Sequence, residues 1–269
     1  MIITAAPNII LSPGVFGNNS YPVILYENIF RNGTVTVSSE QATGEKENAY
    51  ELGNTNDFWK PTGTSDQWMR VKLGSPVNVN AVGIAAHNLF NVGGGIRVEY
   101  TEDNGSTWLP LTGILNSTSR RPQMMVFGTL AVDDIRVLFT GHTADITVGV
   151  LALGELLAFP RGVGPGYRSP LDNQDVSVVS AVSTTGALLG TSEISRMSQL
   201  NAEINLLERD FMVNKYRAFQ ESAVHYPFFW SANEVDSFEV FYGKSYNRPT
   251  SVWSTTVHQK AEIRARGFY

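Results

Sequence analysis

Residues 67–73 alternate between polar and apolar side chains, and this pattern indicates the fold. Trp68, Arg70 and Lys72 fall on one set of alternate positions, while the residues between them are Met, Val and Leu. Successive side chains of a β-strand point to opposite faces, so this alternation predicts a strand with one buried and one solvated face. A Gly-Ser-Pro turn follows, and the apolar residues 77–86 predict a second strand.

Short strands separated by turn residues recur from about residue 26 to residue 157. The Asn104-Gly105 pair favours a tight hairpin turn, because both residue types readily adopt positive φ. Helical periodicity is missing here, so the pattern favours a β-sandwich or jelly roll. The remaining strands expected in this region cover residues 34–38, 96–101, 124–127, 134–140 and 146–153.

Residues 160–170 mark a change in organisation, since their Gly and Pro content can continue neither a helix nor a central strand. We place a domain boundary there, with the first domain over 26–157 and the second over 158–269. Residues 1–25 contain three prolines and two glycines among short apolar pieces. They are expected to form an arm that packs on the second domain.

The second domain is expected to be mostly β with one helix. Apolar residues recur at helical spacing over residues 210–223, at Met212, Tyr216, Phe219 and Ala223. Pro227 ends this pattern. Alternating or apolar segments at 198–206, 238–242 and 257–266 predict strands. The fold class is therefore mainly β, with a jelly-roll sandwich and a second β domain carrying one α-helix.

Composition excludes several classes of function. The 269 residues carry a net charge of -5 and no cysteine, so disulfides and thiolate metal sites are unavailable. An acidic chain without basic runs does not suit nucleic-acid binding. The most apolar stretch, 148–159, is too short to span a bilayer, and residues 1–7 lack the positive charge of a secretion signal.

No catalytic motif is present, and no catalytic residue, metal site or cofactor is expected. The sequence lacks Gly-x-Ser-x-Gly, His-x-x-x-His and a phosphate-binding glycine loop ending in Lys-Ser/Thr. Its four histidines are scattered along the chain. We therefore expect a protein that is not an enzyme.

Several aromatic motifs follow one another in the first domain: Asn48-Ala49-Tyr50, Asp57-Phe58-Trp59, the residues Gln67 to Gly74, and Asp103-Asn104-Gly105-Ser106-Thr107-Trp108. Their order is similar to that of discoidin-type, galactose-binding-like jelly rolls. The family pattern places an Asp where this chain has Lys72, and no calcium site carries over. The resemblance implies a fold that often binds glycans or lipids and elsewhere acts as a spacer.

Four residues are candidates for ligand binding at one end of this jelly roll: Trp59, His87, Asn88 and Arg121. A solvent-facing Trp in a sandwich loop can stack on a sugar ring. The alternative for Trp59 is that its ring seals the end of the barrel. His87 is expected to be an ordinary core or surface residue more often than a residue that binds a ligand.

The second domain is expected to contain, in this order, a strand, a helix, Pro227-Phe228-Phe229, an aromatic strand and a final strand. This order of elements resembles that of the belt domain of bacteriophage distal tail proteins. That resemblance implies a ring of copies beneath the tail tube, expected to be hexameric, with the jelly roll inserted into the belt. The interface expected from it comprises Tyr216, Phe219, Phe228, Phe229, Trp230, Arg264 and Arg266.

Two functions follow as hypotheses. The main one is a structural protein of a phage tail tip or baseplate, located in the virion, assembled in the host cytoplasm and contacting tail-tube and hub proteins. The alternative is a carbohydrate-binding module that adheres to a host-surface glycan. Neither requires a nucleic acid or insertion into a membrane.

Overall fold

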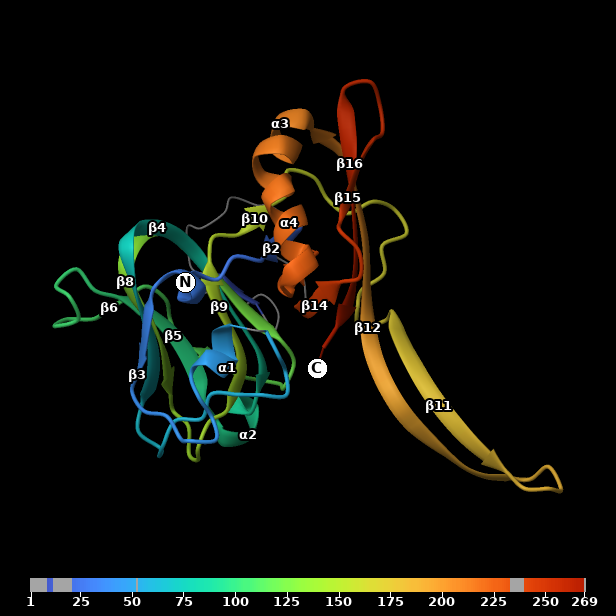
Figure 1. Cartoon of the computed structure of the whole chain (residues 1–269), viewed down its shortest axis with the longest axis horizontal. Helices are drawn as coiled ribbons and strands as arrows, with labels where there is room; N and C mark the ends of the chain where they lie inside the picture. The colour runs from blue at the N-terminus through green and yellow to red at the C-terminus, as the bar shows by residue number, and fades with distance from the viewer. Residues whose placement is uncertain (1–8, 12–20, 52, 233–239, 269) are drawn as a thin grey trace.

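The computed structural model describes residues 9–11, 21–51, 53–232 and 240–268, which form two mainly antiparallel sheets and one long helix (Figure 1). The fold class expected from the sequence is confirmed. The first sheet contains β1 (Ile9–Leu11), β3 (Thr34–Val37), β4 (Gln67–His87), β5 (Gly95–Tyr100), β6 (Leu109–Pro110), β7 (Leu115–Asn116), β8 (Gln123–Thr140) and β9 (Val148–Gly154). The second contains β2 (Val23–Leu25), β10 (Leu157–Ala158), β11 (Gln174–Val182), β12 (Leu188–Glu208), β13 (Phe228–Ser231), β14 (Phe241–Ser245), β15 (Thr250–Trp253) and β16 (His258–Gly267).

The first sheet closes into the jelly roll because β4 and β8 are long and pair with each other along most of their lengths. The sequence predicts two strands separated by the Gly-Ser-Pro turn. In the structure the strand continues through that turn as β4, with a register shift between Lys72 and Val77. Both halves of β4 supply side chains to the same core, including Val71 and Ile84. Three short helices, η1 (Ile29–Asn32), α1 (Glu47–Tyr50) and α2 (Leu89–Val92), complete this part.

The second sheet is covered on one face by a continuous helical segment, made of α3 (Arg209–Phe211), η2 (Met212–Tyr216) and α4 (Arg217–His225). The helix predicted over residues 210–223 is confirmed, and it begins one residue earlier and ends two residues later. Its apolar positions Met212, Tyr216, Phe219 and Ala223 are all buried against the sheet.

The five aromatic residues expected at an interface between copies are instead core residues, so that expectation is wrong for them. The aromatic face of the helix and of β13 is already covered by its own chain. The exposed fractions of Tyr216, Phe219, Phe228, Phe229 and Trp230 are 0%, 0%, 1%, 1% and 0%. Arg264 and Arg266, in contrast, are exposed on β16.

The chain enters and leaves the jelly roll at neighbouring points of the second sheet. β2 precedes the jelly roll and β10 follows it, and these strands pair with each other at Ile24 and Leu157. β2 also pairs with β13, in a register that joins Ile24 to Trp230. The jelly roll is thus inserted into the second sheet. Of the arm expected to pack on the second domain, β2 does so, whereas β1 pairs with β8 of the jelly roll. Residues 1–8 and 12–20 of the arm lie outside the described residues.

A shared core joins the two sheets. On β4, Ala81 and Ala85 face away from the jelly-roll interior and pack in a cluster with Phe229 and Tyr242 of the second sheet. The Tyr242 hydroxyl donates a hydrogen bond to the carbonyl of Gly53, at 2.8 Å. The two parts are therefore held together by apolar packing and a buried hydrogen bond.

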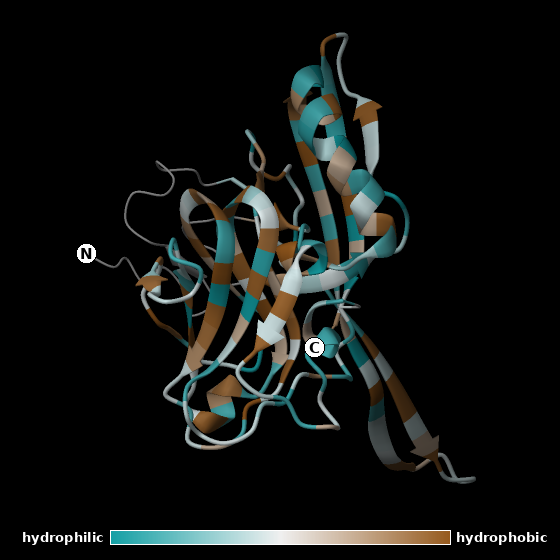
Figure 2. Ribbon diagram, turned by 60° about the vertical axis from the view of Figure 1, so that its left-hand side comes forward, coloured by the Kyte–Doolittle hydropathy of each residue, from teal (hydrophilic) through white to brown (hydrophobic). Residues whose placement is uncertain are grey.

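One element extends away from both cores. The hairpin of β11 and the first half of β12 projects beyond the rest of the molecule (Figure 1), and apolar residues are distributed along it (Figure 2). The sequence reasoning did not predict this hairpin. Its turn contains Gly186, whose φ of 86° is one that glycine adopts readily.

Candidate functional site

The candidate ligand-binding residues are located at one end of the jelly roll, where β4 ends and β9 begins. Trp59 forms an isolated bridge with Val148, and His87 pairs with the same residue. Asn88 follows directly and donates its backbone amide to the carbonyl of Thr147. Arg121 precedes β8, whose first residue pairs with β4 close to this end. The structure therefore brings these parts of the chain together at what we call the α2 end.

Trp59 cannot stack on a sugar in this arrangement, because its side chain is 0% exposed. Its indole Nε1 donates to the carbonyl of Ser39 at 3.0 Å, and its ring packs on Phe139 with centroids 5.5 Å apart. The expectation of a ligand-binding role is corrected for this residue. The alternative expectation, that the ring seals the end of the barrel, describes its position.

His87 and Asn88 support the loops of the α2 end. The His87 side chain is 6% exposed, and neither ring nitrogen has a hydrogen-bond partner among the described residues. Burial lowers the pKa of His87 to about 4, so the imidazole is neutral at pH 7. The Asn88 side chain donates to the carbonyl of Asp145 at 3.0 Å and accepts from the amide of Thr147 at 2.8 Å. These contacts hold the loop between β8 and β9 in place.

The exposed aromatic residue at this end is Phe90, which the sequence reasoning missed. Phe90 is 50% exposed, whereas its neighbour Leu89 is 1% exposed, because one turn of helix directs adjacent side chains to different faces. In the sequence, the signal for an exposed aromatic residue was the pair of adjacent apolar residues Leu89 and Phe90, shortly after a strand. α2 ends at Gly93, whose φ of 73° is left-handed. The amide of Thr143 donates to the carbonyl of Val92 at 2.9 Å and fastens α2 to the neighbouring loop.

The residue that follows Phe90 is polar. Asn91 is exposed beside Phe90, and its side-chain oxygen accepts a hydrogen bond from Arg120 Nε at 3.1 Å. Arg121, another residue proposed from the sequence, is also exposed. An apolar ring with a few neighbouring amide and guanidinium groups can bind a ligand that has both an apolar face and hydroxyl groups.

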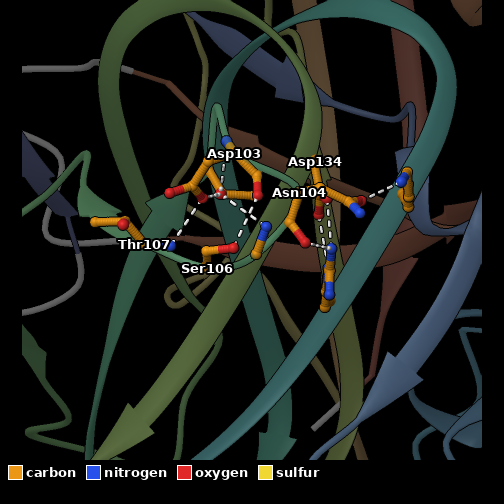
Figure 3. Close-up of polar contacts among 9 residues, drawn as sticks. Asp103, Asn104, Ser106, Thr107 and Asp134 are labelled. Atoms are coloured by element: carbon orange, nitrogen blue, oxygen red, sulfur yellow. Dashed lines mark hydrogen bonds and ion pairs between the residues drawn. The ribbon is translucent and has the colours of Figure 1, made fainter.

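A second polar cluster lies on the outer face of the jelly-roll sheet, around the predicted Asn-Gly turn (Figure 3). Asp103 accepts hydrogen bonds from the Thr107 amide at 2.8 Å and the Thr101 hydroxyl at 2.7 Å. The Thr107 amide contributes most to lowering the pKa of Asp103 to about 2. Asn104 has a φ of 61° and Gly105 a φ of 93°, which confirms the turn expected there.

Charged side chains on this face are paired with one another. Arg70 donates to Asp134, with Nε and Oδ1 2.7 Å apart, and Arg136 donates to Glu99 with Nε and Oε2 2.8 Å apart. The Arg136 guanidinium also lies 4.1 Å from the centre of the Trp108 ring. Because these groups satisfy each other, the face stabilises the hairpin.

Two further observations concern only the described residues. No group of three or more His, Asp or Glu side chains in them is arranged to hold a metal ion. No helix in the same part of the chain combines the length and apolar character needed to cross a membrane.

Comparison with known proteins finds a matching family model. Residues 34–149 match the F5/8 type C domain family, which is similar to the jelly roll described above. The match extends from β3 to the start of β9 and includes the α2 end. No curated protein sequence matches the chain.

Solved structures with a similar fold include carbohydrate-binding modules and fucosidases. A chitosan-binding module from a Paenibacillus sp. IK-5 chitosanase/glucanase is 21% identical, with a TM-score of 0.40, over 48% of this chain and 99% of the module. A pectin-binding carbohydrate-binding module is 16% identical, with a TM-score of 0.39, over 45% of this chain and 89% of its own. A Clostridium perfringens protein in complex with GalNAc-β-1,3-galactose is 14% identical, with a TM-score of 0.41, over 48% of this chain and 100% of its own.

Proposed function

We propose that the jelly roll binds carbohydrate at the α2 end and that the chain has a binding role, with no catalytic one. The observation that carries this proposal is the exposed Phe90 ring at the α2 end, followed in the chain by Asn91, whose side chain accepts a hydrogen bond from Arg120. One face of a pyranose ring presents C–H groups that pack on an aromatic ring, while its rim of hydroxyls accepts hydrogen bonds from amide and guanidinium groups.

The rigidity of the α2 end supports this proposal. A binding residue on a fixed element loses little conformational freedom when the ligand binds. α2 is fastened through Val92 and Gly93, and the adjoining loop is fastened through Asn88. The F5/8 type C match over residues 34–149 is consistent with a ligand-binding jelly roll.

The test is a glycan array with the full chain, followed by titration calorimetry on the strongest ligand. Soluble chitosan, pectin and GalNAc-β-1,3-galactose belong in the panel. We expect Phe90→Ala to weaken binding at least tenfold and Arg120→Ala to weaken it by a smaller factor. Tyr246→Ala is the matched control, because it removes an aromatic ring of similar exposure, 42%, from the second sheet. Unchanged affinity in Phe90→Ala, or no binding to any glycan, would contradict the proposal.

A second candidate function is supported by the insertion topology. β2 and β10 are neighbours in the second sheet, so that sheet acts as a scaffold from which the jelly roll is displayed. Such an arrangement suits a ring of scaffolds that presents many jelly rolls at once. We propose, as this second function, a structural component of a phage tail tip or baseplate that assembles with its own copies and with other tail proteins in the virion.

Light scattering coupled to size-exclusion chromatography, with negative-stain electron microscopy, tests this second function. Closed rings of the purified chain are the expected result. A chain that remains monomeric at high concentration and yet binds a glycan would leave only the first function. Rings without glycan affinity would leave only the second.

A further inference from the structure

The hairpin formed by β11 and the first half of β12, residues 174–198, exposes a large number of apolar side chains. Leu188, near its tip, is 66% exposed, and Val178, in the middle of β11, is 51% exposed. The exposed apolar residues of this hairpin are Val176, Val178, Val179, Val182, Leu188, Leu189 and Ile194. We call this segment the projecting hairpin.

The apolar residues lie on both faces of the projecting hairpin. Val178 and Val179 are adjacent in one strand, so their side chains point to opposite faces, and both are more than half exposed. Strands with apolar residues on both faces are normally covered on both faces. A two-stranded ribbon alone is at best marginally stable in water. Among the described strands, β11 is moreover the last in its sheet, so one of its edges has no partner there.

A second exposed apolar patch lies at the opposite end of the same sheet (Figures 1 and 2). It is formed by Val252 and Trp253 of β15 and by Val257 before β16, which are 49%, 54% and 63% exposed. We call it the β15 patch. β12 runs from the projecting hairpin to this end, where Glu208 pairs with His258.

We propose that the projecting hairpin of one copy docks on the β15 patch of the next copy, head to tail. The proposal rests on the second function and names the surfaces that would make its ring. A heterologous contact of this kind covers both patches at once, and it closes into a ring when the rotation between copies permits. The same contact leaves the α2 end of each jelly roll outside the interface residues.

Size and charge favour a second copy as the occupant. The projecting hairpin spans 25 residues, from 174 to 198, and a standard interface uses roughly 20 to 30 residues on each side. It contains Asp175, Glu193 and Arg196, a formal charge of -1. Residues 250–261, around the β15 patch, contain Lys260 as their charged residue at pH 7, and its ammonium is ion-paired with Glu203 and Glu262. Both surfaces are thus close to neutral, so an apolar contact between two copies meets little charge repulsion.

Sedimentation velocity of the full chain tests the contact. We expect the wild-type chain to form oligomers. Val178→Lys with Val182→Lys in the projecting hairpin, and separately Trp253→Lys in the β15 patch, should each give monomers. Val213→Lys is the matched control, since it places the same charge at a residue of similar exposure, 51%, on the helix. Circular dichroism of each variant shows whether its fold is kept.

Mixing the two monomeric variants tests the head-to-tail geometry. The hairpin variant keeps an intact β15 patch, and the patch variant keeps an intact projecting hairpin, so their mixture should form a heterodimer and nothing larger. Oligomers that persist in both variants would overturn the docking surfaces while leaving ring assembly standing. No heterodimer on mixing would overturn the head-to-tail arrangement. A monomeric wild-type chain would overturn both the contact and the second function.

Discussion

The junction between the jelly roll and the second sheet depends on a row of small residues on β4. Ala81, Gly83 and Ala85 occupy alternate positions and so share one face of the strand. A Cβ added at Gly83 would lie 2.8 Å from two ring carbons of Phe229. Carbon atoms pack best at about 3.5 to 4.0 Å. Gly83→Ala therefore forces the two sheets apart or the ring out of place.

We expect Gly83→Ala to lower the free energy of unfolding by about 2 to 3 kcal/mol, within the range for overpacked cores. Phe229 is 1% exposed and cannot swing into solvent without losing its own burial. For a chain of this size, the melting temperature should fall by about 5 to 10 °C. Urea unfolding followed by fluorescence and by circular dichroism gives the free energy and tests whether the two probes report one transition.

Gly128→Ala is the matched control, because a Cβ at Gly128 in β8 would meet no atom within 4 Å. Its effect should stay within about 0.5 kcal/mol. Adding Phe229→Leu should make Gly83→Ala less costly, with an interaction energy of about 1 kcal/mol in the double-mutant cycle. Equal stability of the two glycine variants, or strict additivity with Phe229→Leu, would refute the proposed packing at this junction.

Three further predictions concern the α2 end and the Asn-Gly hairpin. Trp59→Phe should lower the free energy of unfolding in urea by about 1 to 3 kcal/mol, because it removes the hydrogen bond of the buried indole and some core volume. It should leave glycan affinity within about twofold. A large loss of affinity at full stability would contradict the core role of Trp59. His87 has a folded pKa of about 4 against an ordinary value of 6.5, so the unfolded chain binds the extra proton first. Stability should therefore fall by up to about 3 kcal/mol as the pH drops from 6.5 to 4. His87→Gln should show a shallower loss over that window, and an unchanged slope would exclude the imidazole. Asp103 has a folded pKa of about 2 against an ordinary value of 3.8, so its contribution to stability is complete above pH 4 and is lost as the pH falls toward 2. An NMR titration should place the pKa of Asp103 below 3. The stability of Asp103→Asn should be less sensitive to acid than that of the wild-type chain.

The strands could be predicted from the sequence wherever one face of the sheet is exposed to solvent. The alternation at residues 67–73 gave the first half of β4, and the apolar face at Met212 to Ala223 gave the helix, because periodicity records burial directly. The second half of β4 is apolar at nearly every position since it is covered on both faces, by the jelly-roll core and by the second sheet. Its partner, Phe229, lies about 150 residues away in the sequence, and no local pattern identifies it.

The site was predictable in its location and only partly in its residues. The motif order placed Trp59, His87 and Asn88 at one end of the jelly roll, and the structure brings them together there. A Trp next to a Lys-Pro pair does not reveal whether its ring points in or out. The aromatic residues 228–230 were likewise predicted to lie at the surface, because the sequence does not show which way their side chains point. In the structure they are buried, Phe228 and Trp230 in the core of the second sheet and Phe229 in the core shared by the two sheets. Exposure depends on long-range packing, which is why Phe90 became visible only in the structure.

The pairing of β2 with β10 has a consequence for how such a chain can change. The ends of the inserted domain emerge from adjacent antiparallel strands, whose paired Cα atoms lie about 5 Å apart. Another domain with closely spaced termini could occupy the same place without altering the strand order of its host. The exchange would have one requirement, an apolar surface to cover Phe229 and Tyr242. The binding specificity of the inserted domain could then change in evolution independently of the assembly surfaces on the second sheet.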